Sequence, residues 1–235
     1  MPINITSLVK IYKNGDKTVT ALAPTTLSFE DHSFTTVVGK SGCGKTTLLR
    51  LLAGLEIPTD GTVNFTVQSP RIGFVFQEPR LMPWLTVSEN ITFAAKSDPL
   101  LAADKLPALL DILGLTAFAH AYPAQLSGGM AQRTALGRTL FQNPDIILMD
   151  EPFGALDYFT RKGLQETLLS LFRQERKTII FVTHDVEEAV LLGERVLIMQ
   201  RGSVTDDLPV QLPYPRDPAS PEVLALRRQI LAGLE

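Results

Sequence analysis

The sequence predicts an α/β protein with a mostly parallel central sheet, an N-terminal antiparallel β subdomain and an inserted α-helical subdomain. Three observations lead to this fold class. Strand-like runs rich in Val, Thr, Ile and Phe fill residues 3–38, helix signals dominate residues 86–143, and two apolar runs, "DIILMD" and "TIIFVTH", flank a helical segment at 158–175. Strands that alternate with helices indicate a mostly parallel sheet, because parallel neighbours need a crossover connection.

The N-terminal part reads as three strands followed by a helix. The strand-like runs are "INITSLVKIY", "TVTALAPTTLSFE" and "FTTVVG", with a turn at Asn14-Gly15. From about Thr47, the run "TLLRLLAGL" has apolar residues at helical spacing and ends at Gly54. Two more strand-like runs, "GTVNFTV" and "RIGFVF", then bring the chain to Gln77.

The sequence predicts helices in the middle of the chain and a tail at its C-terminal end. The runs "TVSENITFAAK", "LPALLDILGL" and "GGMAQRTALGRTLFQN" carry helix signals. Prolines become frequent from Pro209 onward, which indicates an extended tail, and "EVLALRRQILAGLE" reads as a short terminal helix. We therefore expect a single domain, 1–235. Its parts are a core with the β subdomain at 1–85 and 144–205, a helical subdomain at 86–143 and a C-terminal tail at 206–235.

Bulk composition narrows the function classes. The 235 residues can bury a sizeable core, and the single cysteine, Cys43, cannot form an internal disulfide, which favours a reducing compartment. Lys plus Arg number 22 against 25 Asp plus Glu, so a nucleic-acid partner has no compositional support. We see no signal peptide and, although the mean hydropathy is +0.12, no apolar run approaches the roughly 18 residues that span a bilayer. Any membrane contact is expected to be peripheral.

The stretch "GKSGCGKTT" predicts a phosphate-binding loop and, with it, a P-loop NTPase fold. It fits G-x-x-x-x-G-K-[ST] and lies between a strand-like run and a helical run. Its glycines let backbone N–H groups face phosphate oxygens, Lys45 reaches the terminal phosphates, and the Thr46 hydroxyl can hold Mg²⁺. The alternative is a flexible glycine turn after a strand. The predicted cofactor-binding residues here are Gly39, Lys40, Ser41, Gly42, Cys43, Gly44, Lys45, Thr46 and Thr47.

The run "DIILMDEP" places two carboxylates after an apolar strand. A carboxylate at a buried strand end is costly unless it meets a cation, so Asp150 is expected to help hold Mg²⁺. The next residue, Glu151, can orient a water that attacks the γ-phosphate or accept its proton. The alternative is a solvated acidic pair at a helix N-terminus.

Two further polar residues, Gln77 and His184, also follow strand-like runs. The carboxyl ends of parallel strands meet at one edge of the sheet, so both side chains could reach the γ-phosphate region. A structural histidine is the alternative for His184. Earlier in the chain, Tyr12 could stack its ring on adenine or could simply pack in the core.

A second glycine pair, in "LSGGMAQR", suits an anion but has no lysine. Ser127 offers a hydroxyl, Gly128 and Gly129 offer open backbone N–H groups, and the helix that follows adds its positive end. The alternative is a Ser-Gly-Gly helix cap.

Taken together and in this order, "GKSGCGKTT", Gln77, "LSGGMAQR", "IILMDEP", "FGALD" and "FVTHD" resemble the ATPase subunit of ATP-binding cassette (ABC) transporters, over roughly residues 3–202. The resemblance implies ATP and Mg²⁺ as cofactors and a second copy of the chain as partner, arranged head to tail. The segment at Ser127 then closes over the ATP of the other copy. By the same resemblance, Glu151 is the catalytic carboxylate, His184 senses the γ-phosphate, and Asp157 crosses the dimer interface.

The resemblance also implies the remaining roles and partners. Tyr12 corresponds to the adenine-stacking aromatic residue, and Gln77 corresponds to the residue that couples Mg²⁺ and the attacking water to a transmembrane permease. The apolar segment around Trp84 in "EPRLMPWLTV" suits permease docking, unless Trp84 is buried between subdomains. The stretch "FQEPRLMPWLTVSENI" and the tail resemble the importer branch for nitrate, sulfonate, taurine and pyrimidine vitamin precursors. Such importers take up a small solute from a solute-binding protein, with the ATPase on the cytoplasmic face of the cell membrane.

Two rival functions remain at this point. Some cassette ATPases act on ribosomes or DNA, but these typically carry a long coiled-coil insertion or two cassettes in one chain, and the sequence shows neither. A stand-alone P-loop kinase or GTPase would have no use for "LSGGMAQR".

Overall fold

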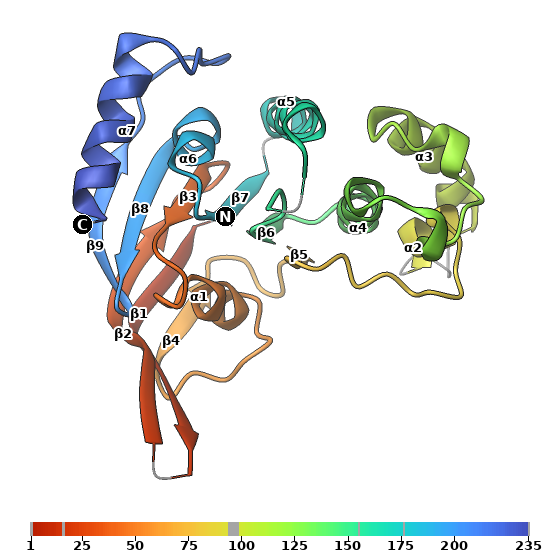
Figure 1. Cartoon of the computed structure of the whole chain (residues 1–235). Coiled ribbons are helices and arrows are strands. Elements are labelled where there is room, and N and C mark those ends of the chain that lie inside the picture. Colours follow the sequence, from red (N-terminus) through yellow and green to blue (C-terminus); the bar gives the residue numbers. More distant parts are fainter. Residues whose placement is uncertain (1, 16, 94–98, 155, 176, 235) are drawn as a thin grey trace.

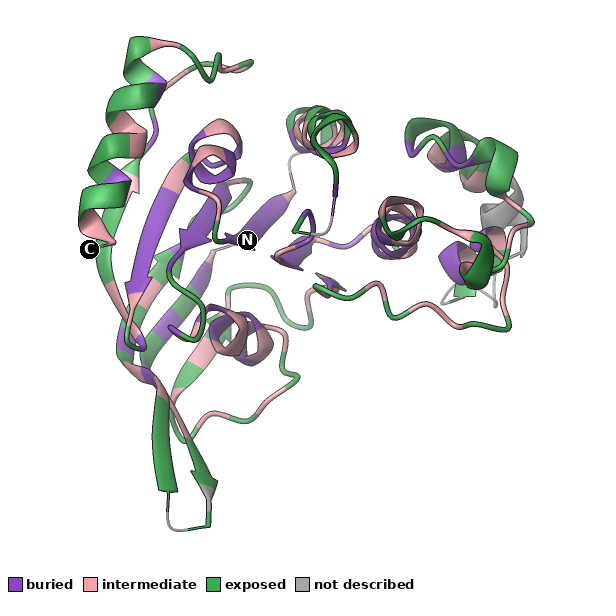
Figure 2. Cartoon of the chain, in the orientation of Figure 1, coloured by how far each residue is buried: buried purple, intermediate pink, exposed green. Residues whose placement is uncertain are grey.

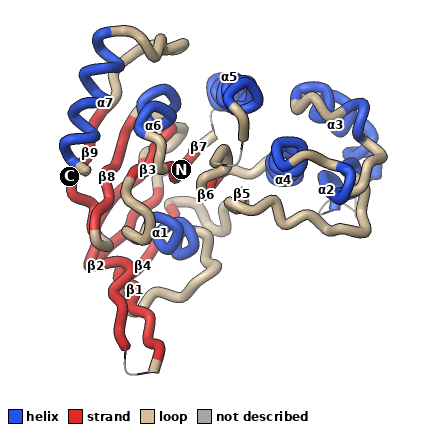
Figure 3. The backbone as a smooth tube through the Cα atoms, viewed as in Figure 1, coloured by secondary structure: helices blue, strands red, loops and turns tan. Residues whose placement is uncertain are grey.

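The computed structural model describes residues 2–15, 17–93, 99–154, 156–175 and 177–234 (Figures 1 and 3). The end of the predicted helical run "TVSENITFAAK", from Ala94 to Lys96, and Ala155 of "FGALD" lie outside the described residues.

The elements follow the predicted order, strand-rich first and then alternating. The strands are β1 (Ile3–Asn14), β2 (Lys17–Phe29), β3 (Phe34–Val38), β4 (Asp60–Phe65), β5 (Ile72–Val75), β6 (Ile146–Asp150), β7 (Thr178–Thr183), β8 (Arg195–Gln200) and β9 (Ser203–Pro209). The α-helices are α1 (Lys45–Leu52), α2 (Val87–Thr92), α3 (Pro99–Ile112), α4 (Gly128–Phe141), α5 (Tyr158–Glu175), α6 (Val186–Leu192) and α7 (Pro221–Gly233), with 3-10 turns η2 (Thr116–Phe118) and η3 (Pro123–Gln125).

A six-stranded sheet forms the centre of the molecule, in the order β5-β6-β7-β3-β8-β9. The first five of these strands run parallel, and only β9 is antiparallel to its neighbour β8. The prediction of a mostly parallel sheet is therefore confirmed. The carboxyl ends of β3, β5, β6 and β7 all lie at one edge, which is where α/β sheets bind ligands.

Both faces of the sheet are covered, and this explains why β6 and β7 are continuous apolar runs. On one face, Ile147 and Phe181 belong to the core shared with α4 and α5. On the other face, Leu148 and Val182 pack with α1 and the N-terminal strands. Side chains alternate between faces with period two, so a strand buried on both sides needs apolar residues at every position. Figure 2 shows the central strands as buried.

The strands β1, β2 and β4 form a separate antiparallel sheet in the order β2-β1-β4, which agrees with the predicted N-terminal antiparallel β subdomain. Asn14 pairs with Lys17 across the hairpin, and Gly15 has a φ of 58°, in the left-handed region that the turn requires. Gly61 in β4 approaches β1 so closely that a Cβ there would lie 2.2 Å from the carbonyl oxygen of Ser7. The β subdomain thus packs backbone against backbone at this point.

The helices α2, α3 and α4 gather on the opposite side of the molecule from β8 and β9 (Figure 1). Thr86 and Glu89 form a capping box at the start of α2, which fixes where the helix begins. In α4, a Cβ on Gly137 would lie 2.7 Å from a Leu113 methyl group, so the missing side chain lets α4 pack closely. The predicted helical subdomain is a compact group of helices attached to the core through α4.

The C-terminal segment packs on the core rather than extending from it. The strand β9 runs to Pro209, so the central sheet includes the first residues of the segment 206–235 that the sequence predicts as a tail. The helix α7 contacts α6, and Val223 and Ile230 are buried between them and the sheet. The predicted terminal helix is present, with Ser220 as its N-cap. No helix in the described part of the chain is both long and apolar enough to cross a membrane.

Candidate active site

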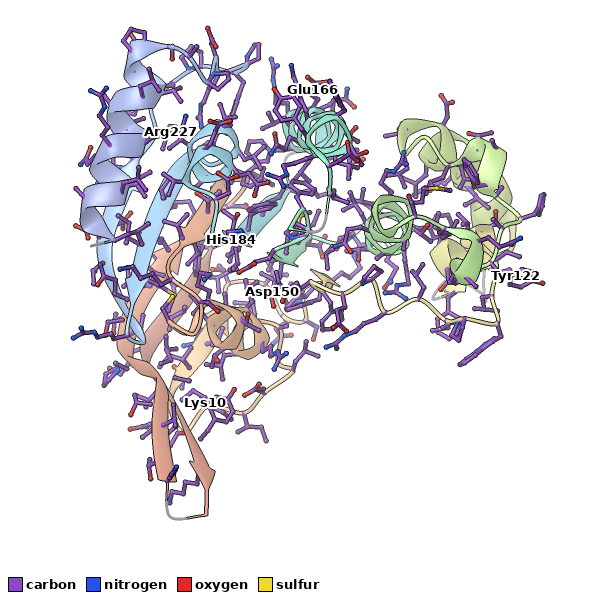
Figure 4. The ribbon with its side chains drawn as sticks, viewed as in Figure 1. Lys10, Tyr122, Asp150, Glu166, His184 and Arg227 are labelled. Atoms are coloured by element: carbon purple, nitrogen blue, oxygen red, sulfur yellow. The ribbon has the colours of Figure 1, made fainter. Side chains whose placement is uncertain are left out.

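The sheet edge carries a cavity of about 310 Å³. It lies where β3, β5, β6 and β7 end, so the parallel sheet brings together residues that are far apart in sequence. Figure 4 labels Asp150 and His184 at this edge. The cavity is lined by Val19, Thr20, Ala21, Ser41, Gly42, Gly44, Lys45, Thr46, Thr47, Gln77, Glu151 and His184.

The loop between β3 and α1 has the geometry of an anion cradle. Gly42 and Gly44 have φ values of 79° and 108°, and a Cβ on Gly44 would lie 2.2 Å from the Ala21 carbonyl oxygen, so only glycine fits there. Gly44 precedes the first residue of α1 without a side-chain cap. The first N–H groups of α1 are therefore available to an anion, which the helix dipole also favours.

Lys45 is buried and held by the loop itself. Its Nζ donates to the carbonyl oxygens of Gly39, at 2.7 Å, and Lys40, at 3.2 Å. Lys45 is only 4% exposed and lines the cavity, so its charge is little screened by solvent. An ammonium group placed in this way can hold the terminal phosphates of a nucleotide.

Thr46 and Asp150 form a pair of oxygen ligands suited to Mg²⁺. The Thr46 hydroxyl donates to Asp150 Oδ1 at 2.9 Å, and Asp150 is 5% exposed at the end of β6. Burial is the main cause that raises the pKa of Asp150, while the hydrogen bond from Thr46 lowers it. A divalent cation would offset the cost of burying this carboxylate. One hydroxyl and one carboxylate fit Mg²⁺, which takes its remaining ligands from phosphates and water.

Glu151 lies between the lysine and the histidine. Its Oε2 is 2.8 Å from His184 Nδ1, and its Oε1 is 3.8 Å from Lys45 Nζ. The backbone of Glu151 has a φ of 45°, a left-handed conformation that is strained for this residue type and is frequent at functional sites. Its N–H continues the β6–β7 ladder by donating to Val182, so the strain is maintained by the sheet. The carboxylate is placed to orient a water in the cavity.

Gln77 and Tyr12 both lie at the surface. Gln77 lines the cavity and is exposed, two residues beyond the end of β5. Tyr12 is 37% exposed, which excludes the core alternative, and its hydroxyl donates to Glu56. Its cross-strand partner in β2, Val19, lines the cavity. The ring therefore lies beside the phosphate loop, where it could stack on a base.

The residues Ser127, Gly128 and Gly129 do not line this cavity. They form the start of α4, and Ser127 Oγ accepts a hydrogen bond from the Met130 N–H at 3.2 Å. The cap alternative is thus correct as local structure. Gly128 has open space around it, and a Cβ on Gly129 would lie 3.3 Å from Leu156 and Thr160. Neither the cap nor the packing around Gly128 explains why the first helical residue lacks a side chain.

Asp157 is exposed at the start of α5, and it accepts hydrogen bonds from the N–H groups of Phe159 and Thr160, both at 3.1 Å. Hydrogen bonds from Thr160 are the largest cause that lowers the pKa of Asp157. The residue caps the start of α5 and is exposed to solvent.

Trp84 is 71% exposed, so the alternative that it is buried between subdomains is wrong. The loop that carries it is rigidly held, because the buried Asn90 amide donates to the carbonyl oxygens of Met82, Leu85 and Thr86. An exposed indole on a fixed loop is typical of an interaction surface.

Sequence reasoning missed the part of the site that comes from β2, Val19, Thr20 and Ala21. The one signal that could have found these residues is the hairpin register, which sets Val19 opposite Tyr12. It also missed Glu56, whose carboxylate accepts the Tyr12 hydroxyl and lies 3.3 Å from Lys10 Nζ and 3.4 Å from Arg50 Nη1.

The site defines a class. A P-loop nucleoside triphosphatase has four parts at the carboxyl edge of a parallel sheet, and all four are present here. They are a glycine loop at the N-terminus of a helix, a buried lysine, a Thr-Asp oxygen pair and an adjacent carboxylate. Residues 22–154 match the ABC transporter family. The chain belongs to this family and is an ATP-binding cassette ATPase.

Individual relatives agree with this assignment. The chain is 41% identical to the aliphatic sulfonates import ATP-binding protein SsuB of Bacillus subtilis (strain 168), with 100% of this chain and 95% of that protein covered. It is 44% identical to the SsuB 1 protein of Paracoccus denitrificans (strain Pd 1222), with 94% and 89% covered. Among solved structures, a dimeric ATP-binding cassette in a post-hydrolysis state with ADP and Pi superposes with a TM-score of 0.81 and 32% identity, covering 89% of this chain and 99% of that chain.

Proposed function

We propose that the chain is the ATP-hydrolysing subunit of a membrane importer, and that two copies close head to tail around two ATP molecules to drive solute uptake. The observation that carries this proposal is the position of Ser127, Gly128 and Gly129. They form an exposed helix start that suits an anion but do not line the chain's own cavity. A second copy would bring this helix start to the phosphates held by Lys45. The dimeric cassette described above supports the arrangement.

The chain's own residues then divide the work at each site. Lys45 and the N–H groups of α1 hold the phosphates, while Thr46, Asp150 and Gln77 would hold Mg²⁺, which neutralises developing charge on the phosphoryl oxygens when bound. Glu151 orients the attacking water and accepts its proton. His184, at 2.8 Å from Glu151, fixes the carboxylate and senses the γ-phosphate.

Closure must be driven by interactions with the nucleotide. Shifting an open–closed equilibrium from 1:99 to 99:1 needs about 5.5 kcal/mol, or roughly 2.7 kcal/mol for each of two sites. Charge-assisted hydrogen bonds contribute about 1.5–3 kcal/mol each, so two of them at each helix start are sufficient. Hydrolysis removes the γ-phosphate that these bonds hold, and the pair reopens.

Hydrogen bonds can transmit a movement of α4 to the surface that we assign to permease docking. Gln132 donates to the Phe76 carbonyl at 3.2 Å, and Arg138 donates to the carbonyls of Pro79 and Arg80 at 3.0 and 2.9 Å. These contacts tie α4 to the segment that runs from Gln77 to Trp84. We assign Trp84 and its loop as the docking surface for transmembrane permease subunits, with the chain peripheral to the cytoplasmic face of the membrane.

The transported solute is recognised by other proteins, namely the permease and a solute-binding protein. The names of the relatives from Bacillus subtilis and Paracoccus denitrificans favour an aliphatic sulfonate within the proposed nitrate, sulfonate, taurine and pyrimidine-precursor branch.

The test is the Glu151→Gln variant, which keeps the shape of the site but cannot activate water. With saturating ATP and Mg²⁺, size-exclusion chromatography with light scattering should show a stable dimer, and without ATP a monomer. Persistent monomer with ATP would contradict the proposal. Purification from detergent-solubilised membranes tests the alternative: a co-purifying multi-span permease supports transport, whereas ribosomes or DNA would support a non-transport cassette ATPase.

A further inference from the structure

One arginine connects two parts of the site that are separate in sequence. Arg161, in the first turn of α5, donates through Nη2 to the Leu156 carbonyl at 3.1 Å, and its backbone N–H donates to the Asp157 carbonyl at 2.9 Å. These contacts hold the short segment that turns into α5. Asp157, at its end, is exposed and faces solvent in the single chain.

The other end of the same side chain reaches the start of α6. Arg161 Nη1 donates to Asp185 Oδ2 at 3.5 Å, and Nε lies 3.6 Å from Glu188 Oε1. Asp185 follows His184 directly and is the N-cap of α6. The guanidinium group therefore bridges Leu156 on one side and the carboxylates next to His184 on the other.

The backbone on both sides of His184 is held by hydrogen bonds that run through the Thr183 hydroxyl to the Glu188 carboxylate. Thr183 donates its hydroxyl to Glu188 Oε2 at 2.7 Å, and the Asp185 N–H donates to Thr183 Oγ1 at 3.0 Å. Glu188 is 5% exposed, so its negative charge depends on the nearby cation. A displacement of Arg161 would change its contacts with Asp185 and Glu188, the two residues through which the backbone at His184 is held.

We propose that Arg161 is a positioning residue that transmits the docking of Asp157 against a second copy to His184 of its own site. This inference rests on the proposed head-to-tail dimer and on the expected position of Asp157 at its interface. When the partner holds the segment at Asp157, Arg161 pulls on the start of α6 and sets the distance between His184 and Glu151. Each site then hydrolyses ATP efficiently only when the dimer is closed at both of its ATP sites.

The experiment measures ATP hydrolysis by the full chain against the concentration of Mg²⁺-ATP. Two coupled sites give the wild-type chain a Hill coefficient that approaches about two, and Arg161→Gln should reduce it to about one. None of the side-chain hydrogen bonds and ion pairs of Arg161 within the described residues involves a residue that lines the cavity, so the half-saturating ATP concentration should stay within about twofold.

Arg227→Gln is the matched control. Arg227 pairs with Glu187 in the same turn of α6, at 2.7 Å, and its side chain is 31% exposed, as is that of Arg161. Its loss removes a comparable ion pair but leaves the link to Leu156 intact, so the Hill coefficient should not change. If Arg161→Gln does not fold, the double variant Arg161→Gln/Glu188→Gln removes the cation together with the buried charge, and the same loss of cooperativity is expected.

An unchanged Hill coefficient in a folded Arg161 variant would overturn the inference, as would an equal loss in Arg227→Gln or a wild-type coefficient of about one. Failure of the dimer proposal is distinguishable from these results, because Glu151→Gln would then not dimerise with ATP. In the Glu151→Gln/Arg161→Gln chain, we expect the ATP-dependent dimer to persist.

Discussion

Replacing Thr46 with valine tests the assignment of the Thr46–Asp150 pair. Valine keeps the branched shape but removes the hydroxyl that donates to Asp150 at 2.9 Å. A hydrogen bond to a charged group contributes about 1.5–3 kcal/mol, and a bond to a neutral group about 0.5–1.5 kcal/mol. We therefore expect the ATP-free chain to lose about 2 kcal/mol of unfolding free energy, and to lose only about 1 kcal/mol when Asp150 is already asparagine.

The loss should also depend on pH. Burial raises the pKa of Asp150 in the folded chain, so folding favours the neutral carboxyl. The stability that this provides is present below the unfolded pKa and is lost as the pH rises through the folded pKa. Removing the Thr46 hydroxyl raises the folded pKa further, because that hydrogen bond lowers it. The cost of Thr46→Val should therefore be larger near neutral pH than in acid.

Urea unfolding of the four chains in this cycle, followed by circular dichroism, gives the numbers. Thr139→Val is the control, since Thr139 is also buried but donates to the neutral carbonyls of Phe74 and Ala135. The loss of unfolding free energy caused by Thr139→Val should be the same with aspartate and with asparagine at position 150. An equal cost of Thr46→Val with aspartate and with asparagine at this position would refute the reasoning, because the hydroxyl would then not be serving the buried charge.

Three other predictions concern the surface, the loop and the tail. Trp84→Ala should weaken co-purification with the permease and leave ATP binding unchanged, because the indole is 71% exposed; a loss of folding, seen as a lower Tm, would count against a docking role. Gly44→Ala should abolish ATP binding in calorimetry and lower the unfolding free energy by at least about 1–2 kcal/mol, because the added Cβ also meets the Ala21 carbonyl. Gly42 is also at positive φ but has open space around it, so Gly42→Ala should lose only the free energy of the strained backbone conformation. Burial raises the pKa of Tyr214 to about 12, so its contribution is present below about pH 10 and is lost between about pH 10 and 12. The unfolding free energy measured across this range should decline by about 3 kcal/mol in the wild-type chain but not in Tyr214→Phe, and an identical decline in that variant would exclude Tyr214 as its cause.

The sequence predicted the phosphate loop and the sheet edge because both depend on local signals. The spacing of Gly39, Gly44 and Lys45 is fixed by the chemistry of phosphate binding, and the alternation of strands and helices brings Asp150 and His184 to the same edge. The family, the fold class and the ATPase activity were predicted correctly for this reason.

The parts that were missed depend on contacts between distant residues. The strand β9 contains two adjacent aspartates, which do not suggest a strand, yet Asp207 is held there by Arg195 at 2.7 Å. Similarly, the prolines after Pro209 indicated an extended tail, but no local pattern shows that α7 packs on α6. Val19 lines the cavity only because β2 pairs with β1, and Arg161 acts only because α5 and α6 are neighbours in space.

In the proposed dimer, Ser127 of one copy meets the phosphate loop of the other copy. Cys43 is the only native thiol, so a Cys43→Ala/Ser41→Cys/Ser127→Cys chain in the Glu151→Gln background offers two defined thiols. Ser41 lines the cavity and Ser127 does not. With ATP and Mg²⁺, a short bifunctional maleimide should join these thiols between copies and give a covalent dimer, which is absent without ATP. A covalent dimer that forms equally without ATP, or none with it, would contradict the account.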